Sequence, residues 1–487
     1  MINTNIPVVT IIGGGFCGMM TAVHLCKRSQ LPLKIIIIND DYPFGKGVAY
    51  SAHTSKYLLN VRAINMSAFP DDKEHFLNWI CKQDDYKAIG KTIMTNVYMP
   101  RKKYGEYLTS VWSEMLQNKN ETVDVELISD TATDISKGPD GYTVKLKHAR
   151  PIVTDFIVLA TGNNKPGNIG ITDEAILSGV KYFSNPWSHA SVSNVQSEKN
   201  ILVVGNGLTM IDTVLGLLEN NFGGTIYTIS TSGFSLLPHK YNLLVYENIV
   251  KELPETYTLH SLLTLVNKHA KSLTKVGIGV HLVIDALRPY TQQIWQSLSF
   301  REKKIFLKKL SYPWNALRHR VPLHIYEHIQ NLRMNKKLIT FSGKLIQATA
   351  TEEGISAVLF DKKNKKEETI IVDRIINCTG PQSNIHECSN TLLRKLAEKR
   401  MIVPDELQLG IDADPATAAV INANGEKSNN IFTIGSNLKG VLWESVAVPE
   451  LRVQAQNLAI TIIDKAAGHL LASLTSLKKK FEQSYIE

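Results

Sequence analysis

Near its N-terminus the chain reads Val8-Val9-Thr10-Ile11-Ile12-Gly13-Gly14-Gly15-Phe16-Cys17-Gly18. The β-branched run predicts a strand, the glycines are spaced G-x-G-x-x-G, and residues 19–27 are typical of a helix. Strand, glycine turn and helix in this order are the context in which the spacing indicates a dinucleotide-binding unit. The alternative is an ordinary glycine-rich turn between a strand and a helix.

The three spaced glycines have different expected roles. Gly13 permits the tight turn out of the strand, Gly15 lets the backbone approach a pyrophosphate, and Gly18 lets the helix pack closely on the strand. The free N–H groups and the positive end of the helix then face the phosphates. We therefore expect cofactor contacts from the whole loop, which comprises Gly13, Gly14, Gly15, Phe16, Cys17 and Gly18.

A second strand is predicted from the continuous apolar run Leu33–Ile38, which is typical of a strand buried on both faces of a parallel sheet. In dinucleotide-binding folds an acidic residue after this strand binds the ribose hydroxyls. Here Asn39 stands at the expected position and Asp40 follows it. Both are candidate cofactor ligands, and a polar turn is the alternative.

Length and composition bound the class of protein. A chain of 487 residues is longer than one hydrophobic core usually organises, so we expect more than one domain. The 44% hydrophobic and 20% charged residues are typical of a soluble globular protein. The net charge of +9 is spread over helices and turns such as residues 362–366, which favours a solvated surface over a nucleic-acid groove. A basic balance also suits anionic cofactors.

The sequence shows neither a secretory signal nor a membrane span. Its start lacks the basic region of a signal peptide, and no apolar run is long enough to cross a bilayer. The five cysteines form no C-x-x-C and no metal-like spacing with histidine, so we expect no metal. We expect a cytoplasmic protein with a small-molecule substrate and without nucleic acid or membrane as a partner. Its oligomeric state carries no sequence signal.

The opening pattern returns in the second part of the chain. At residues 201–210 a predicted strand runs into Gly205 and Gly207, and a helix follows. Each copy also ends in a later strand that leads into a Thr-Gly pair, at Thr161-Gly162 and at Thr379-Gly380. The repeat predicts an α/β protein with two Rossmann-like dinucleotide-binding domains. Two nucleotides in one chain indicate electron transfer between two cofactors.

The second copy departs from the full pattern in two places. Met210 replaces the third glycine, so the helix should pack less closely on its strand. Residues 230–233, Ser-Thr-Ser-Gly, follow its second strand, where an arginine would accommodate the 2′-phosphate of NADPH. No arginine is present there, so the loop by itself does not favour NADPH over NADH.

The remaining candidate cofactor contacts lie in loops. Two polar and apolar loops before residue 70 could wrap a flat heterocycle, and a glycine-containing segment after residue 430 could close the same site from its other side. Each loop taken alone also reads as plain connecting structure. The candidates are Gly47, Asn60, Met66, Thr161, Gly162, Gly435, Gly440 and Trp443.

The nested order of the two copies predicts interleaved domains. We expect one dinucleotide-binding domain at 1–166 and 381–487, and a second at 167–380 with a helical insertion at about 236–331. In the insertion, Arg318, His319 and Arg320 could hold a phosphate or carboxylate, with His319 as a general acid or base near neutral pH. An ion-paired or solvated helix end is the alternative. No other residue indicates itself as catalytic.

Together these motifs resemble the bacterial FAD-NAD(P)-binding protein family, which is similar to flavin-containing and N-hydroxylating monooxygenases. The resemblance covers nearly the whole chain and rests on residues 13–18, 43–51, 59–70, 159–162, 204–212, 318–320 and 443–445. It implies FAD on the first glycine loop and NADPH or NADH on the second.

Three functions follow as alternatives. The first is an FAD-dependent oxidoreductase reduced by NAD(P)H, in the form of a monooxygenase that acts on a small polar or amine-containing substrate. The second is a nicotinamide-dependent flavin reductase or dehydrogenase that inserts no oxygen. The third is a non-catalytic flavin-binding sensor protein. Oxidation of NAD(P)H by the purified protein separates the third from the other two.

Overall fold

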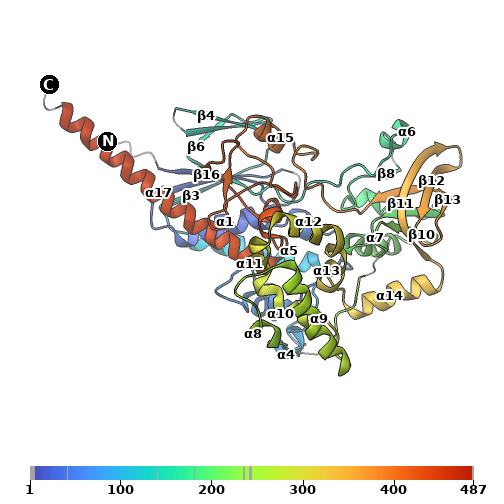
Figure 1. Cartoon of the computed structure of the whole chain (residues 1–487). Coiled ribbons are helices and arrows are strands. Elements are labelled where there is room, and N and C mark those ends of the chain that lie inside the picture. The colour runs from blue at the N-terminus through green and yellow to red at the C-terminus, as the bar shows by residue number, and fades with distance from the viewer. Residues whose placement is uncertain are drawn as a thin grey trace. The chain divides into compact units, whose positions relative to one another are not determined.

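The structure, a computed structural model, describes residues 6–40, 42–139, 141–179, 181–233, 236–240 and 244–484. The chain forms two compact units, each assembled from more than one segment (Figure 1). The first comprises Met1–Ala52, Val61–Asn164 and Ser383–Glu487, and the second comprises His53–Asn60 and Lys165–Gln382. The sequence analysis did not predict that 53–60 joins the second unit. Which nucleotide each domain binds stays a prediction.

The first unit is built on a six-stranded sheet in the order β15-β16-β7-β1-β2-β3. All neighbours are parallel except β15 and β16. The side chains of Val9, Ile11 and Ile35 are fully buried, as expected for strands covered on both faces. The strands are β1 (Val8–Ile12), β2 (Leu33–Ile38), β3 (Val123–Ile128), β7 (Phe156–Leu159), β15 (Ala419–Ile421) and β16 (Lys427–Thr433).

Helix α1 (Phe16–Arg28) follows the first strand directly and packs against α5 (Arg101–Asn118) and α17 (Val448–Ser484). A second, antiparallel sheet contains β4 (Ala132–Gly138), β5 (Gly141–Leu146) and β6 (Ile152–Thr154). Helix α15 (Thr391–Glu398) packs against β4. The shorter helices of this unit are α2 (Gly47–Tyr50), η1 (Ala63–Asn65), α3 (His75–Ile80), α4 (Lys91–Met94), η4 (Gly435–Leu438) and α16 (Lys439–Leu442).

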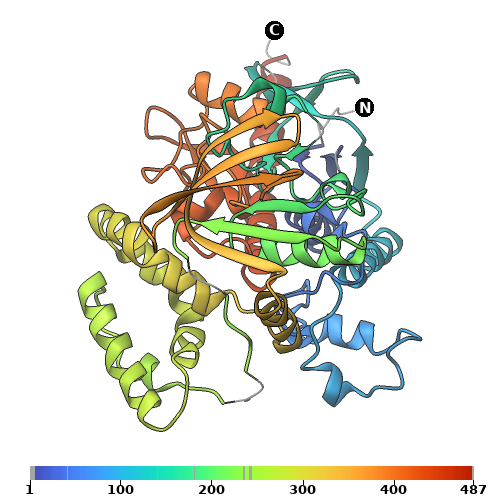
Figure 2. The same ribbon diagram turned by 90° about the vertical axis from the view of Figure 1, so that its right-hand side faces the viewer.

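The second unit is built on a seven-stranded sheet in the order β13-β12-β11-β10-β9-β14-β8. Strands β8, β14, β9 and β10 are parallel, whereas β11, β12 and β13 form an antiparallel meander (Figure 2). Strand β11 joins the two parts, because its first half pairs with β10 and its second half with β12. The strands are β8 (Tyr182–Phe183), β9 (Asn200–Val204), β10 (Thr225–Ser230), β11 (Leu338–Thr351), β12 (Gly354–Asp361), β13 (Lys366–Val372) and β14 (Arg374–Asn377).

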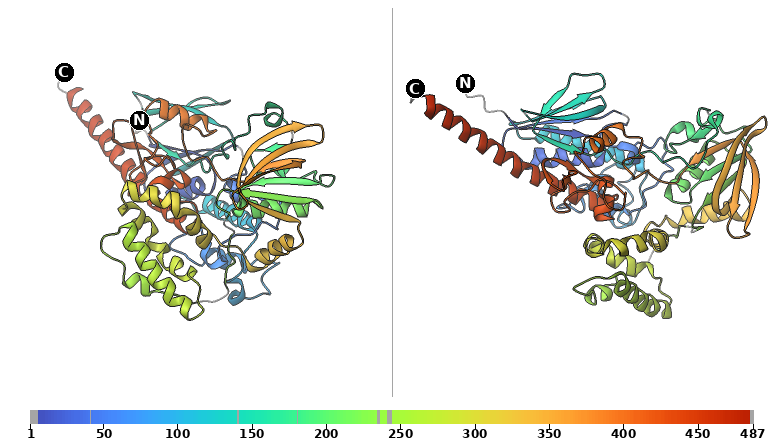
Figure 3. Two further views of the ribbon diagram at one scale, coloured as in Figure 1. Left: turned by 45° about the vertical axis from the view of Figure 1, so that its right-hand side comes forward. Right: turned by 45° about the horizontal axis from the view of Figure 1, so that its top comes forward.

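Two groups of helices accompany this sheet. Helices α7 (Leu208–Glu219) and α14 (Leu323–Met334) contribute to the core of the sheet, where Ile329 shares a cluster with Ile226. The helices of the insertion lie together as one group (Figure 3). They have a core of their own, which includes Ile249, Leu273 and Val283. They are α8 (Asn248–Lys251), α9 (Leu259–Lys275), α10 (His281–Leu287), η3 (Arg288–Tyr290), α11 (Thr291–Ser297), α12 (Phe300–Lys309) and α13 (Ser311–Arg318). The last helix of the predicted insertion, α14, thus packs with the sheet.

Two sheets with parallel strands at their centres, each with a glycine turn between a strand and a helix, confirm the predicted α/β class with two dinucleotide-binding domains. Outside them lie α6 (Glu174–Leu177) and η2 (His189–Ser191). Among the described residues, no helix has the length and apolar character that crossing a membrane would require.

Candidate functional site: two glycine turns

The two glycine turns share one local geometry. Gly13 has φ +109°, donates its N–H to the Ile38 carbonyl at 2.9 Å, and an added Cβ would lie 2.2 Å from the Ala160 oxygen. Gly205 has φ +122°, donates to the Ile229 carbonyl at 2.7 Å, and an added Cβ would lie 2.3 Å from the Cys378 oxygen. At both positions the backbone and its neighbours exclude every residue but glycine.

Gly15 and Gly207 differ from these turn glycines. They are the N-caps of α1 and α7 and have extended backbones, with φ −75° and −93°. A Cβ on Gly15 would find its nearest neighbour at 3.7 Å, the Cα of Gly47, and a Cβ on Gly207 would have nothing within 4 Å. Neither backbone conformation nor packing therefore explains these two glycines. Close approach of a bound group to the backbone would explain both.

The ends of α1 and α7 that follow these glycines are suited to anions. Neither N-cap has a side chain that could bond the first N–H groups, and neither helix has an acidic residue in its first turn. The first N–H groups of a helix have no partner within the helix and lie at its positive end. A pyrophosphate placed beside Gly15 or Gly207 would accept these N–H groups.

The third position of the motif separates the two copies. A Cβ on Gly18 would lie 1.9 Å from the Gly13 oxygen, so α1 touches its own turn. The corresponding Met210 is buried at 1% exposure among the core residues of the second sheet. Helix α7 therefore leaves room for a side chain at a position where α1 leaves none.

Further predicted residues surround the first turn. Gly47, with φ +52°, faces Gly15, and a Cβ on Gly47 would lie 3.3 Å from the Cα of Gly15. A Cβ on Gly14 would lie 2.7 Å from Oδ1 of Asn39. A Cβ on Gly435 would lie 3.0 Å from Sγ of Cys17. The structure thus gathers Asn39, Gly47 and Gly435 around the loop formed by 13–18.

The end of β7 is joined to the segment that contains Gly435. Asn437 Nδ2 donates to Thr161 Oγ1 at 3.0 Å and to the Leu159 carbonyl at 3.2 Å. Gly162, with φ +68°, has open space where a Cβ would stand. Hydrogen bonds therefore connect the segment that contains Thr161 to the segment that contains Gly435.

Of the two predicted residues after Gly435, Gly440 has a structural explanation of its own, whereas Trp443 has an unfavourable backbone conformation. A Cβ on Gly440 would lie 2.0 Å from Cγ of Asp405, so packing against this buried carboxyl requires glycine. Trp443 is buried and has φ +61°, a conformation that costs a bulky residue about 1–3 kcal/mol. Lys439 Nζ lies 5.6 Å from the centroid of the Trp443 ring. Burial lowers the pKa of this lysine.

Asn39 also bonds outside the first turn, and three other predicted contacts, Asp40, Met66 and Asn60, are less directly connected to it. Asn39 Nδ2 donates to the Tyr42 carbonyl at 2.9 Å. Asp40 accepts a hydrogen bond from the hydroxyl of Thr131. Met66 is buried, and its N–H donates to the Ala63 carbonyl at 3.1 Å. Asn60 lies in the second unit, where its carbonyl bonds to His239 Nε2 at 3.0 Å.

Two groups near the first glycine turn, the Cys17 thiol and the Tyr50 hydroxyl, have raised pKa values. Burial raises the pKa of the Cys17 thiol to about 12, so this cysteine carries no thiolate at neutral pH. Burial also raises the pKa of Tyr50, whose ring meets Phe16 edge-on at 6.5 Å. In the second copy, burial raises the pKa of Cys378 to about 12, and its Sγ lies 3.3 Å from Thr213 Oγ1.

The loop after β10 has a cationic neighbour that the sequence analysis missed. Lys362 Nζ donates to the Thr231 carbonyl at 2.8 Å, and Thr231 Oγ1 lies 3.2 Å from the Tyr312 hydroxyl. Lys362 belongs to the basic run 362–366, which the composition led us to interpret as solvated surface. The signal was present in the sequence, but only strand pairing shows which loop this run meets.

The three candidate catalytic residues lie at the end of α13. Arg320 is buried, and its Nη2 donates to both carboxylate oxygens of Asp285 at 2.7 Å. Arg318 is buried as the last residue of the helix, and the His319 N–H donates to the Asn315 carbonyl at 2.8 Å. Arg320 thus agrees with the alternative interpretation of these residues, an ion-paired helix end. A catalytic role for any of the three stays a prediction.

Comparisons with known proteins support a nucleotide-binding role for the part of the chain that contains the first glycine turn. The model of a family described as FAD-NAD(P)-binding matches residues 10–164, which contain the loop formed by 13–18. This confirms the resemblance drawn from the sequence. No curated protein matches the chain in sequence. The described residues contain no group of three or more histidine, cysteine or acidic side chains placed to hold a metal ion.

Solved structures are similar over nearly the whole chain. An ornithine N-hydroxylase from Kutzneria sp. 744, described with reduced FAD, NADP+ and L-ornithine, has a TM-score of 0.66 at 14% identity and covers 94% of this chain and 98% of its own. An ornithine hydroxylase from Pseudomonas aeruginosa has a TM-score of 0.65 at 15% identity, covering 94% and 99%. A bacillithiol disulfide reductase from Staphylococcus aureus has a TM-score of 0.54 at 13% identity, covering 94% and 98%. The chain therefore has the fold of FAD/NAD(P)-binding oxidoreductases.

Proposed function

We propose that the protein is an FAD-dependent oxidoreductase reduced by NAD(P)H, with FAD on the first glycine turn and the nicotinamide nucleotide on the second. The observation that carries this proposal is the pair Gly15 and Gly207. Both are glycines that the fold itself does not require, and both stand at the start of a helix whose N-cap offers its first N–H groups no side-chain hydrogen bond. The repeated geometry calls for a phosphate-bearing ligand at each turn.

The residues around the first turn fit FAD. Gly15 and Gly47 face each other, and neither adds a side chain at the start of α1, where we place the pyrophosphate. Asn39 stands at the end of β2, where ribose hydroxyls bind in this fold, and Thr161 and Gly435 border the loop from the other side. In the second unit, Gly207 and the loop after β10 take the corresponding roles.

We infer a hydroxylation of a small polar or amine-containing molecule as the reaction. A bound nicotinamide nucleotide supplies a hydride, and a bound flavin passes the electrons on to oxygen. In balance, the amine, O₂, NAD(P)H and a proton give the hydroxylamine, water and NAD(P)+. The similar structures with TM-scores of 0.66 and 0.65 are ornithine hydroxylases, which favours this chemistry.

Disulfide reduction is less well supported. A disulfide reductase needs a reactive thiolate, and thiolates form at cysteines whose pKa is lowered. In this chain burial raises the pKa of Cys17, Cys26 and Cys378 to about 12. The sequence also contains no C-x-x-C pair.

An assay of the purified protein with NADPH and oxygen tests the proposed reaction. We would offer L-ornithine, L-lysine and cadaverine separately and measure NADPH consumption, hydroxylamine product and hydrogen peroxide. Hydroxylamine from one of these amines, with less peroxide than in its absence, is the expected result. NADPH consumption that yields no hydroxylamine with any amine would favour a reductase or oxidase. No NADPH consumption would favour a non-catalytic flavin-binding protein.

A further inference from the structure

We propose that Lys362 recognises the 2′-phosphate of NADPH and makes the second unit selective for NADPH over NADH. This inference rests on the proposed binding of a nicotinamide nucleotide at Gly205 and Gly207. The sequence provides no arginine in the loop 230–233. The structure supplies a cation to the same loop from a distant part of the chain.

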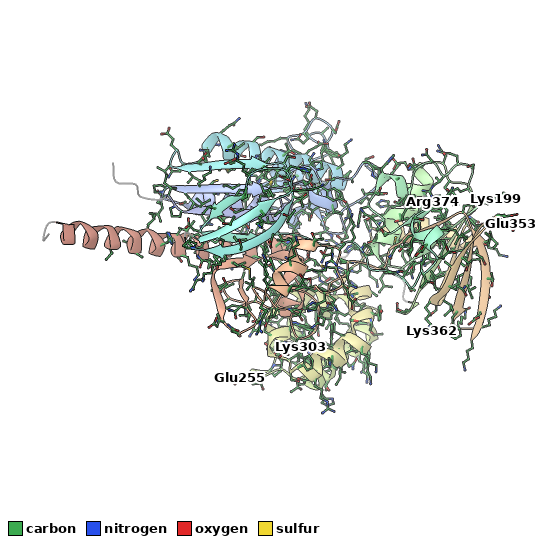
Figure 4. The ribbon with its side chains drawn as sticks, turned by 90° about the horizontal axis from the view of Figure 1, so that it is seen from above. Lys199, Glu255, Lys303, Glu353, Lys362 and Arg374 are labelled. Carbon is green, nitrogen blue, oxygen red and sulfur yellow. The ribbon has the colours of Figure 1, made fainter. Side chains whose placement is uncertain are left out.

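The position of Lys362 follows from strand pairing. In dinucleotide-binding folds the residues after the second strand lie beside the adenosine ribose and distinguish its 2′-hydroxyl from a 2′-phosphate. That strand is β10 here, and Thr231 follows it directly. Lys362 stands at the beginning of the turn between β12 and β13 (Figure 4). Its ammonium donates to the Thr231 carbonyl at 2.8 Å.

The turn that carries Lys362 is held in place by its own contacts. The Lys362 N–H donates to the Ser342 carbonyl at 2.7 Å, which fixes the turn beside the end of β10–β11 pairing. Asp361 is buried, and its carboxylate accepts hydrogen bonds from the Lys363 N–H at 2.8 Å and from Asn364 Nδ2 at 2.7 Å. Lys362 is therefore presented from a structured turn.

The loop 230–233 is fixed against the same strand. Gly233 has φ +65°, and an added Cβ would lie 2.6 Å from Ser342 Oγ. Its N–H donates to Ser230 Oγ at 3.3 Å. Ser342 thus contacts both the loop that should meet the ribose and the turn that carries Lys362. The ammonium has a fixed relation to the expected 2′-position.

The charge of Lys362 is available for an anion. The structure gives its ammonium a backbone carbonyl as acceptor, which leaves two of its three N–H donors for other acceptors. By contrast, Lys366 in the same hairpin pairs with Glu368 Oε1 at 2.7 Å. Arg320, which the sequence analysis named as a possible phosphate ligand, is paired with Asp285. Lys362 is thus the better placed cation for a phosphate at this loop.

Binding of nucleotide fragments to the full-length flavoprotein tests the inference without catalysis. We would measure the affinity for adenosine 2′,5′-bisphosphate and for AMP by calorimetry in the wild type, Lys362→Met and Lys366→Met. Loss of one charge-assisted contact costs about 1.5–3 kcal/mol, which is about 10- to 100-fold in affinity. We expect this loss for the bisphosphate in Lys362→Met, AMP affinity within about twofold of wild type, and no change in Lys366→Met. Lys362→Arg should retain the affinity for the bisphosphate.

Two results would overturn the inference. One is an equal loss for both fragments in Lys362→Met, which would mean that the lysine only supports the loop. The other is an unchanged preference in Lys362→Met and in Lys362→Glu, where a carboxylate should repel the 2′-phosphate. In either case, flavin reduction by NADH and NADPH would leave the proposed function standing. If neither nucleotide bound the wild type or reduced its flavin, the proposed function itself would fail.

Discussion

Single glycines in the two turns have separable physical reasons. Glycine is required at 13 and at 205 for two reasons. The backbone has a positive φ, and an added Cβ would lie 2.2 Å or 2.3 Å from a carbonyl oxygen. Gly18 is required by packing alone, because α1 touches the turn that precedes it. Gly15 and Gly207 are required by neither. This division turns a sequence motif into predictions that differ for neighbouring residues.

Gly13→Ala should destabilise the first unit even without a cofactor. The positive φ alone costs about 1–3 kcal/mol, and the new Cβ would also collide with the Ala160 carbonyl. Gly162→Ala is the matched control, because its φ is +68° but nothing lies within 4 Å of the new Cβ. Calorimetric melting of the flavin-free proteins should show the larger fall in Tm for Gly13→Ala. Equal falls would mean that the collision is relieved at no cost.

His24 should make the stability of the first unit depend on pH. It is fully buried, and neither of its ring nitrogens has a hydrogen-bond partner among the described residues. Burial, with a smaller contribution from Arg28, lowers its pKa to about 4. The unfolded chain takes up the proton near pH 6.5, so stability is present above that pH and is lost as the pH falls toward 4.

The expected loss from His24 between pH 7 and pH 5 is about 2 kcal/mol in the free energy of unfolding. His24→Leu should remove this part of the pH dependence, whereas the exposed His386 should be replaceable by leucine without removing it. Urea unfolding at the two pH values measures the difference. The same slope of stability against pH in wild type and His24→Leu would exclude His24 as its source.

Among the helices and strands, local sequence patterns predicted the two strand–turn–helix units. They did not predict contacts between residues that are far apart in the sequence. The apolar runs of β1, β2 and β9 and the glycine turns that follow β1 and β9 could be located because buried parallel strands and positive φ restrict residue choice strongly. The approach of Lys362 to Thr231 could not be, because it depends on pairing between β10, β11 and β12. The ion pair of Arg320 with Asp285 joins residues 35 positions apart and leaves no local signal.

Helix α17 should tolerate shortening at its C-terminal end. Its buried side chains include Leu458, Ile462 and Ala466, and the described side chains after Ala466 are not buried. In Figures 1 and 3 the last part of this helix extends away from the strands of its own unit. Deletion of residues 471–487 should therefore keep the flavin and change Tm little.

The matched control for this truncation is Ile462→Ala in the full-length chain. Deleting a buried aliphatic side chain costs about 2–5 kcal/mol, so this single change should lower Tm more than removal of residues 471–487. Melting of both proteins decides the comparison. A larger fall in Tm for the truncation would show that the end of α17 contributes to the folded unit.

In the molecule as a whole, we propose that each of the two units binds one nucleotide. Both units have a sheet that contains parallel strands, a positive-φ glycine after the first of the paired glycine-turn strands, and a helix that begins at a glycine that the fold does not explain. The second unit additionally carries the helical insertion and the basic turn at Lys362. A chain with two such sites is suited to take electrons from one nucleotide and deliver them to another.

If FAD binds at the first turn and the nicotinamide nucleotide at the second, valine in place of Gly15 and valine in place of Gly207 should cause different defects. Gly15→Val should yield a colourless protein, because its side chain would occupy the place of the FAD pyrophosphate. Gly207→Val should remain yellow, because the change lies in the other unit and a Cβ there meets no protein atom within 4 Å. Dithionite serves as the control, since it should bleach the flavin of Gly207→Val as readily as that of the wild type.

Anaerobic stopped-flow absorbance of the flavin after mixing with NADPH is the most direct test. The account predicts bleaching in the wild type and bleaching slowed by more than about tenfold in Gly207→Val, as expected when about 1.4 kcal/mol or more of nucleotide binding is lost. Full flavin occupancy in Gly15→Val, or unchanged reduction by NADPH in Gly207→Val, would contradict it.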